Sequence, residues 1–76
     1  MKMLKDVELN KEERCLIAAV INADRNYGVP CYESNVGGFA CAYAAGLLKE
    51  AVKRFADRSL PTLYTAQAAL AKIEAA

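Results

Sequence analysis

The side chains with the most chemical potential gather between residues 29 and 37. Cys31, Tyr32, Glu33, Ser34 and Asn35 follow one another there, in a connector that is long for a link between two helices. A reactive thiol needs a base or a cation that lowers its pKa, but the chain has no histidine, and the nearby Glu33 would raise the pKa of Cys31. We therefore interpret Cys31 as a small buried residue, with a reactive thiol as the alternative.

The other cysteines give no clearer sign of chemistry. Cys41 falls in the first turn of an expected helix, where the helix dipole favours a thiolate, but its neighbours are apolar. Three cysteines without Cys-x-x-Cys spacing, in a chain without histidine, argue against a zinc site and against a disulfide framework. We predict no metal, no cofactor and no enzymatic activity.

The run Ser-Asn-Val-Gly-Gly at residues 34–38 precedes an expected helix and could present free N–H groups to an anion. A phosphate-binding loop would also need a preceding strand and a Gly-Lys-Ser/Thr ending, and both are missing. Helix capping by Ser34 or Asn35 explains the same residues more simply.

This run continues into a stretch without charge that extends to Leu48. Small residues recur there at every fourth position and would form one stripe on a helix, while larger apolar residues form a second stripe. A small stripe lets another helix approach closely, and a helix that is apolar on most sides must be covered on most sides. The small stripe either seats another helix of the same chain or forms a symmetric contact with a second copy. The predicted contact residues are Gly38, Phe39, Ala42, Tyr43, Gly46 and Leu47.

Three helices are expected, at about residues 10–27, 38–58 and 60–75. Asn10 followed by Glu13 is typical of a capping box at a helix start, and Gly28 suits the left-handed end of that helix. Ser59 is a good cap for the third helix.

Apolar spacing predicts which helix faces are buried. On the first helix the expected buried residues are Leu16, Ala19, Val20, Ala23 and Tyr27, which repeat every three or four positions. Ile17 and Ile21 lie off this face and pack either on the loop that follows or on another subunit. The third helix has a heptad-like face, formed by Leu63, Ala66, Leu70 and Ile73.

Length and composition favour an all-α, small three-helix domain that is completed by dimerisation through the second helix. A chain of 76 residues buries a small core, so association with a second copy would help to stabilise it. A net charge of +1 lacks the strongly basic character of a dedicated nucleic-acid binder. The start of the chain leads into no apolar signal segment, and the uncharged run is too short to span a bilayer.

These observations predict a soluble, cytoplasmic protein–protein interaction module that acts as a homodimer, with another protein as a further partner and no membrane partner. The alternative is a small nucleic-acid-binding regulator, in which the second and third helices form a helix-turn-helix. Its expected phosphate contacts are Lys49, Lys53, Arg54 and Arg58. The third helix carries one basic residue, Lys72, and neither Arg nor Asn to read a base edge.

Overall fold

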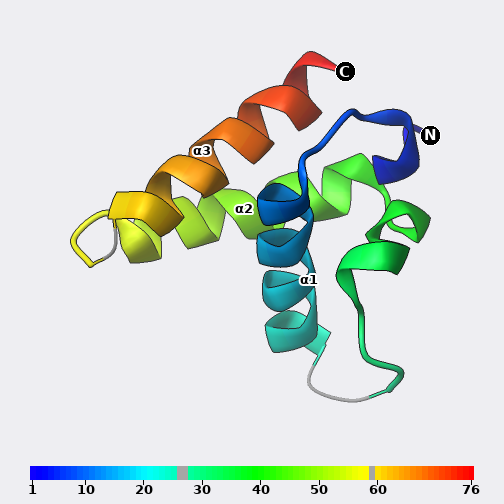
Figure 1. Cartoon of the computed structure of the whole chain (residues 1–76), viewed down its shortest axis with the longest axis horizontal. Coiled ribbons are helices and arrows are strands. Elements are labelled where there is room, and N and C mark those ends of the chain that lie inside the picture. The colour runs from blue at the N-terminus through cyan, green and yellow to red at the C-terminus, as the bar shows by residue number, and fades with distance from the viewer. Residues whose placement is uncertain (26–27, 59) are drawn as a thin grey trace.

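The fold consists of α-helices and short 3₁₀-helices in the computed structural model, which describes residues 1–25, 28–58 and 60–76 (Figure 1). In chain order the elements are η1 (Leu4–Asp6), α1 (Lys11–Arg25), η2 (Glu33–Gly38), α2 (Cys41–Phe55) and α3 (Leu60–Ala75). The predicted all-α class with three helices is confirmed. The predictions for Tyr27 and Ser59 lie outside the described residues.

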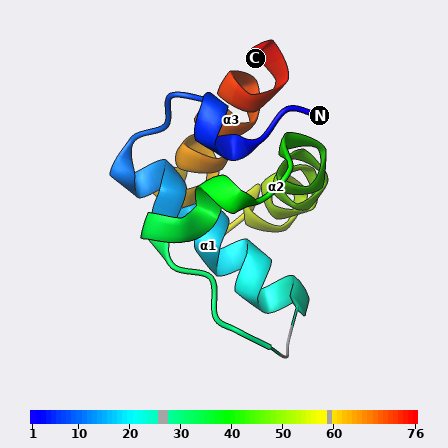
Figure 2. The ribbon, with the colours of Figure 1, turned by 90° about the vertical axis from the view of Figure 1, so that its right-hand side faces the viewer.

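The helices α2 and α3 run side by side in opposite directions, and α1 projects from this pair, so that the molecule has an L-shaped outline (Figure 1). Figure 2 looks roughly along α2 and shows α1 and α3 on different sides of that helix. The molecule measures 31 × 29 × 19 Å. This arrangement leaves an open angle between α1 and the α2–α3 pair.

Local signals set the start of α1. The backbone N–H of Asn10 donates to Glu13 Oε1, and the N–H of Glu13 donates to Asn10 Oδ1, both at 2.8 Å. This reciprocal pair is the predicted capping box, which satisfies two of the N–H groups that a helix start leaves free. Gly28 has a φ of 100°, in the region that favours glycine, as predicted.

The prediction of one continuous helix over residues 38–58 is wrong at both ends, because α2 covers only Cys41–Phe55. The residues before it form η2, and Phe39 and Ala40 are extended, with ψ of 151° and 143°. The N-terminal segment explains the break: the N–H of Leu4 donates to the Phe39 carbonyl, and the N–H of Cys41 donates to the Lys2 carbonyl, both at 2.9 Å. Because of η2, residues 29–37 are also not one irregular loop.

The predicted buried face of α1 is wrong. Ile17 and Ile21 are completely buried, whereas Ala19 and Ala23 are exposed and Leu16 and Val20 are only half-buried. The physical reason is that the segment after α1 folds back onto the helix and brings Cys31 and Val36 into the same core as the two isoleucines. Of the two alternatives for Ile17 and Ile21, packing on the following segment is therefore the one observed.

The predicted face of α3 is largely correct. Ala66 and Ile73 are buried and Leu63 and Leu70 are half-buried, while Ala69 is an additional buried residue.

Candidate functional site

The segment around Cys31 is held by structural contacts. The side-chain amide of Asn22 donates to the Cys31 carbonyl at 2.7 Å and accepts the N–H of Cys31 at 2.6 Å. Cys31 is 3% exposed, and burial raises the pKa of its thiol, an effect that the nearby Arg25 partly opposes. The interpretation of Cys31 as a small buried residue is confirmed, although burial is the main cause of its raised pKa. Cys41 is buried as well.

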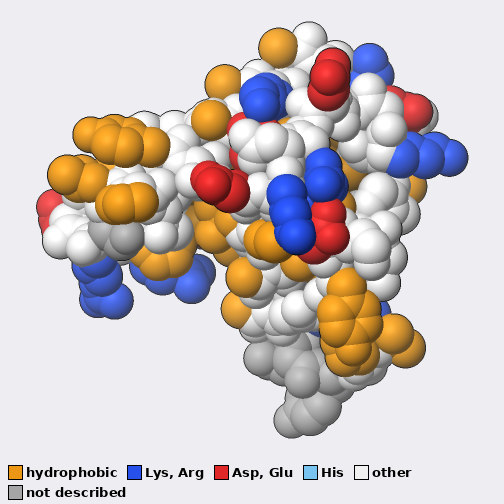
Figure 3. Space-filling model, viewed as in Figure 1, with side chains coloured by type: hydrophobic (Ala, Val, Ile, Leu, Met, Phe, Trp, Pro, Cys, Tyr) orange, Lys and Arg blue, Asp and Glu red, His pale blue; other side chains and the backbone are white. Residues whose placement is uncertain are grey.

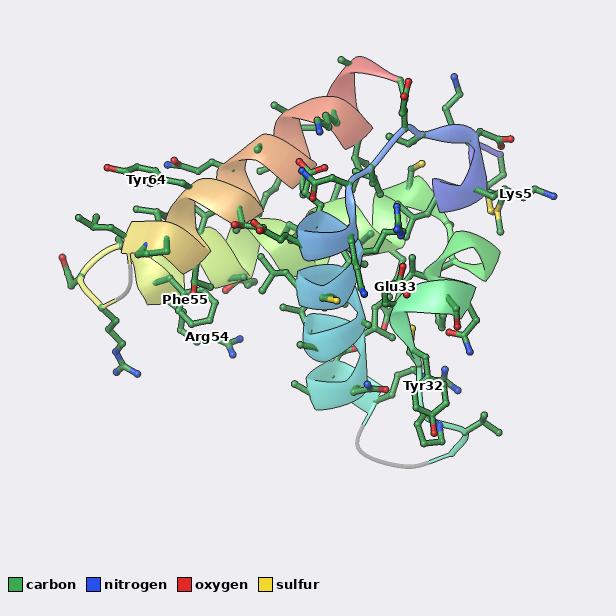
Figure 4. All side chains as sticks on the ribbon, viewed as in Figure 1. Lys5, Tyr32, Glu33, Arg54, Phe55 and Tyr64 are labelled. Carbon is green, nitrogen blue, oxygen red and sulfur yellow. The ribbon has the colours of Figure 1, made fainter. Side chains whose placement is uncertain are left out.

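The polar neighbours of Cys31 also make hydrogen bonds and ion pairs within the chain. Glu33 forms an ion pair with Arg14 at 2.8 Å, and Arg14 donates a further hydrogen bond to the Leu9 carbonyl. Asn35 Oδ1 accepts the N–H of Tyr32 at 2.8 Å, so Asn35 stabilises the start of η2. The predicted capping of the second helix by Ser34 or Asn35 is wrong, because Ala40 precedes α2 and its side chain makes no capping hydrogen bond. Figure 4 shows Glu33 between η2 and α1. These side chains therefore fasten η2 to the rest of the molecule. Arg14, Glu33 and Ser34 also line a hollow of about 340 Å³ between the N-terminal segment and η2.

The stripe of small residues on α2 is open to solvent. Gly38, Ala42 and Gly46 are all exposed, and a Cβ atom added to either glycine would meet nothing within 4 Å. The prediction that this stripe seats another helix of the same chain is wrong, because Gly38 precedes α2, and α1 and α3 pack on other sides of it (Figure 2). Contact with a second copy through this stripe stays a prediction.

The second stripe begins with two aromatic residues that fasten α2 to the end of α1. The rings of Phe39 and Tyr43 stack with centroids 6.0 Å apart, and Arg25 Cζ lies 5.6 Å from the Phe39 centroid. The Tyr43 hydroxyl donates to Asp24 Oδ2 at 2.6 Å, and this hydrogen bond raises the pKa of Tyr43. Both rings are half-buried, so part of the predicted contact surface is already used within one chain.

Leu47, the last member of the second stripe, lines a groove of about 440 Å³ between α1 and α2. The groove follows the open angle of the molecule, where Figure 3 shows hydrophobic side chains gathered between α1 and the α2–α3 pair. Its apolar lining comes from Leu16, Ala19, Val20 and Ala23 of α1 and from Leu47, Ala51 and Phe55 of α2. The α1 face that the sequence assigned to the core therefore lines an open groove.

A second hollow of about 570 Å³ lies between the first turns of α1 and of α3. It contains Cys15 and Pro61, and it shares Leu16 with the hollow between α1 and α2. We call the two hollows together the α1 groove. It follows α1 from Lys11 to Asp24, which is about 20 Å at the rise of an α-helix.

Charged residues stand beside this apolar lining. Glu50 and Arg54 of α2 and Asp24 of α1 line the hollow between those helices, and Lys11 and Glu12 line the other one. Sequence periodicity found the apolar residues of α1, and its only signal for the groove was that Ile17 and Ile21 lie off the predicted face and widen the apolar arc of the helix. An arc that includes both Ile17 and Leu16 cannot be covered by one neighbouring segment.

The expected phosphate contacts are all exposed, and two of them take part in ion pairs. Lys49 Nζ lies 3.5 Å from Glu74 Oε2, and Lys53 Nζ lies 3.7 Å from Glu50 Oε1. Moreover, α2 and α3 run alongside each other (Figures 1 and 2), whereas the two helices of a helix-turn-helix meet at about 90–120°. The arrangement therefore favours the nucleic-acid alternative less than the sequence did.

Within residues 1–25, 28–58 and 60–76, no group of three or more His, Cys, Asp or Glu residues could hold a metal ion. No helix in the same ranges combines the length and the apolar character needed to cross a membrane. Comparisons of the chain with protein-family models, with curated proteins and with solved structures found no match.

Proposed function

We propose that this protein is a non-catalytic protein–protein interaction module, and that its α1 groove takes up the apolar face of a helix from another protein. The observation that carries the proposal is the amphipathic face of α1, whose apolar residues line an open groove although their spacing is that of a buried face. An amphipathic helix in an apolar groove is a recurrent mode of recognition. Large apolar surfaces that remain open commonly mark such sites.

The dimensions of the groove suit this occupant. About 20 Å of groove, with charged residues at both ends, corresponds to roughly 13 residues of helix, or between three and four turns. Alanines at positions 19 and 23 keep the floor low, so the backbone of a second helix can approach closely, while Leu47 and Phe55 provide larger contacts on the α2 side.

The thiols suit a reducing compartment, and we propose the cytoplasm as the place of action. Cys15, Cys31 and Cys41 are all free, and disulfides are rare where thiols are kept reduced.

Synthetic amphipathic helices of differing charge test the groove directly, since Cys15 is exposed within it and the other two cysteines are buried. We expect a bound helix to slow the alkylation of Cys15 and to raise the fluorescence anisotropy of a labelled peptide. Ala19→Glu, which places a carboxylate in the floor, should abolish both effects. The matched variant Ala42→Glu, also on an exposed helical face, should leave them unchanged.

If no peptide protects Cys15, or if Ala19→Glu binds as well as the unmodified protein, the groove is not a helix-binding site.

A further inference from the structure

The helix α3 carries a second apolar face, on the side that turns away from the rest of the molecule. Its exposed members are Leu60, Tyr64, Ala68, Ala71 and Ala75, which we call the outer face of α3. At 100° per residue these five positions fall within a narrow arc of the helix. Figure 3 shows hydrophobic side chains along this outer edge, and Figure 4 shows Tyr64 pointing away from the molecule.

The large residues on this face are open to solvent in a single chain. Leu60 is 57% exposed and Tyr64 is 61% exposed, and the five positions include no charged residue.

We propose that the outer face of α3 binds the same face of a second copy, with the two helices antiparallel. The order of side-chain sizes along the face supports this occupant. Large residues stand near the start of α3, at Leu60 and Tyr64, and alanines stand at its middle and end.

A twofold axis next to Ala68 places each large side chain opposite small ones. Tyr64 of one copy then lies across from Ala71 of the partner subunit, and Leu60 lies across from Ala75 of the partner subunit. Closed symmetric dimers require such self-complementary surfaces, and close packing requires large residues to fit against small ones. The antiparallel direction also sets opposite ends of the two helix dipoles side by side.

In this proposal the dimer forms through α3, and not through the second helix as the sequence predicted. It also leaves the α1 groove free, because the groove lies in the open angle of the molecule, where Pro61 and Thr65 line it and the residues of the outer face do not. The dimer would thus offer two grooves to other proteins, and the dimer can be tested without reference to the groove.

The test uses charge at Ala68, which lies beside the twofold axis in both copies. We expect the protein, with a chain mass of 8.2 kDa, to show twice that mass by light scattering behind size exclusion. Ala68→Glu and Ala68→Lys should each halve the mass, because two like charges then face each other. An equimolar mixture of the two variants should restore the dimer, and this recovery shows that both variants are folded. Ala42→Glu, on the exposed stripe of α2, should leave the dimer intact.

A monomeric mass for the unmodified protein at high micromolar concentration would overturn the proposal. So would a dimer that Ala42→Glu dissociates and Ala68→Glu does not, since the contact would then lie on α2. Neither result affects the peptide test of the α1 groove, which a monomer can pass or fail by itself.

Discussion

Lys72 on α3 reaches the capping carboxylate of α1: its Nζ donates to Glu13 Oε1 at 2.7 Å, across 59 positions of sequence. The same oxygen accepts the N–H of Asn10, and the Glu13 side chain is 2% exposed. A single buried carboxylate therefore caps the start of α1 and also fastens α1 to α3. The contact thus joins the two helices, α1 and α3, that line the hollow of about 570 Å³ in the candidate site.

Replacing Lys72 with methionine should destabilise the protein by about 2 kcal/mol, because a buried carboxylate loses its cation and keeps only backbone donors. Urea denaturation would measure this loss. Lys53→Met is the matched control, since the ion pair of Lys53 with Glu50 is exposed on both sides and should contribute less than about 0.5 kcal/mol. Equal unfolding free energies for the two variants would contradict a structural role for the Lys72–Glu13 contact.

The fold could be predicted from sequence where short-range signals decide it. The Asn10–Glu13 capping box and the positive φ of Gly28 depend on residues close together in the chain, and both were correctly predicted. The start of α2 was not correctly predicted, because it depends on backbone hydrogen bonds with Lys2, which accepts, and Leu4, which donates, more than 30 positions away. No local sequence pattern indicates that an N-terminal segment will pair with Phe39 and Cys41.

The candidate groove shows a second limit of sequence reasoning. The apolar arc of α1 contains both Ile17 and Leu16, and periodicity alone does not say which part of a wide arc faces the core. The return of residues 31–36 across α1 decides it in favour of Ile17. The prediction thus found the residues that line the groove and assigned them to the core.

Two glycine substitutions should change stability in opposite directions. The close backbone contact of this structure lies at Gly37, and not in the stripe of small residues that the sequence predicted. A Cβ atom on Gly37 would lie 3.0 Å from Lys5 Cβ and 3.3 Å from Lys5 Cα, whereas one on Gly46 would meet nothing within 4 Å. Gly46→Ala should stabilise the protein by about 0.5–1 kcal/mol, since alanine is the better helix former. Gly37→Ala should destabilise it by about 1 kcal/mol or more through overpacking against η1.

Thermal or urea unfolding of the two glycine variants checks these opposite signs. If Gly46→Ala were destabilising while the protein stayed in the same oligomeric state, some contact would have to occupy the α2 stripe. Stabilisation by Gly37→Ala would show that η1 does not pack on η2 as described.

The hydrogen bond between Tyr43 and Asp24 predicts a change in stability at alkaline pH. The bond needs the protonated phenol, and it raises the pKa of Tyr43 above its ordinary value of 10.0. A group whose folded pKa is raised contributes its stability in full below the unfolded pKa and loses it as the pH rises through the folded one. The free energy of unfolding should therefore hold this contribution up to about pH 10 and lose it above that pH.

Tyr43→Phe removes the hydroxyl and should lower stability at neutral pH by less than about 1 kcal/mol, because the bond is exposed to solvent. It should also flatten the fall above pH 10, which urea denaturation at a series of pH values would measure. Some of the fall should persist in this variant, since burial also raises the pKa of Cys31, and Cys31→Ala should remove that part. An identical alkaline fall with and without the Tyr43 hydroxyl would show that its bond to Asp24 does not hold α2 to the end of α1.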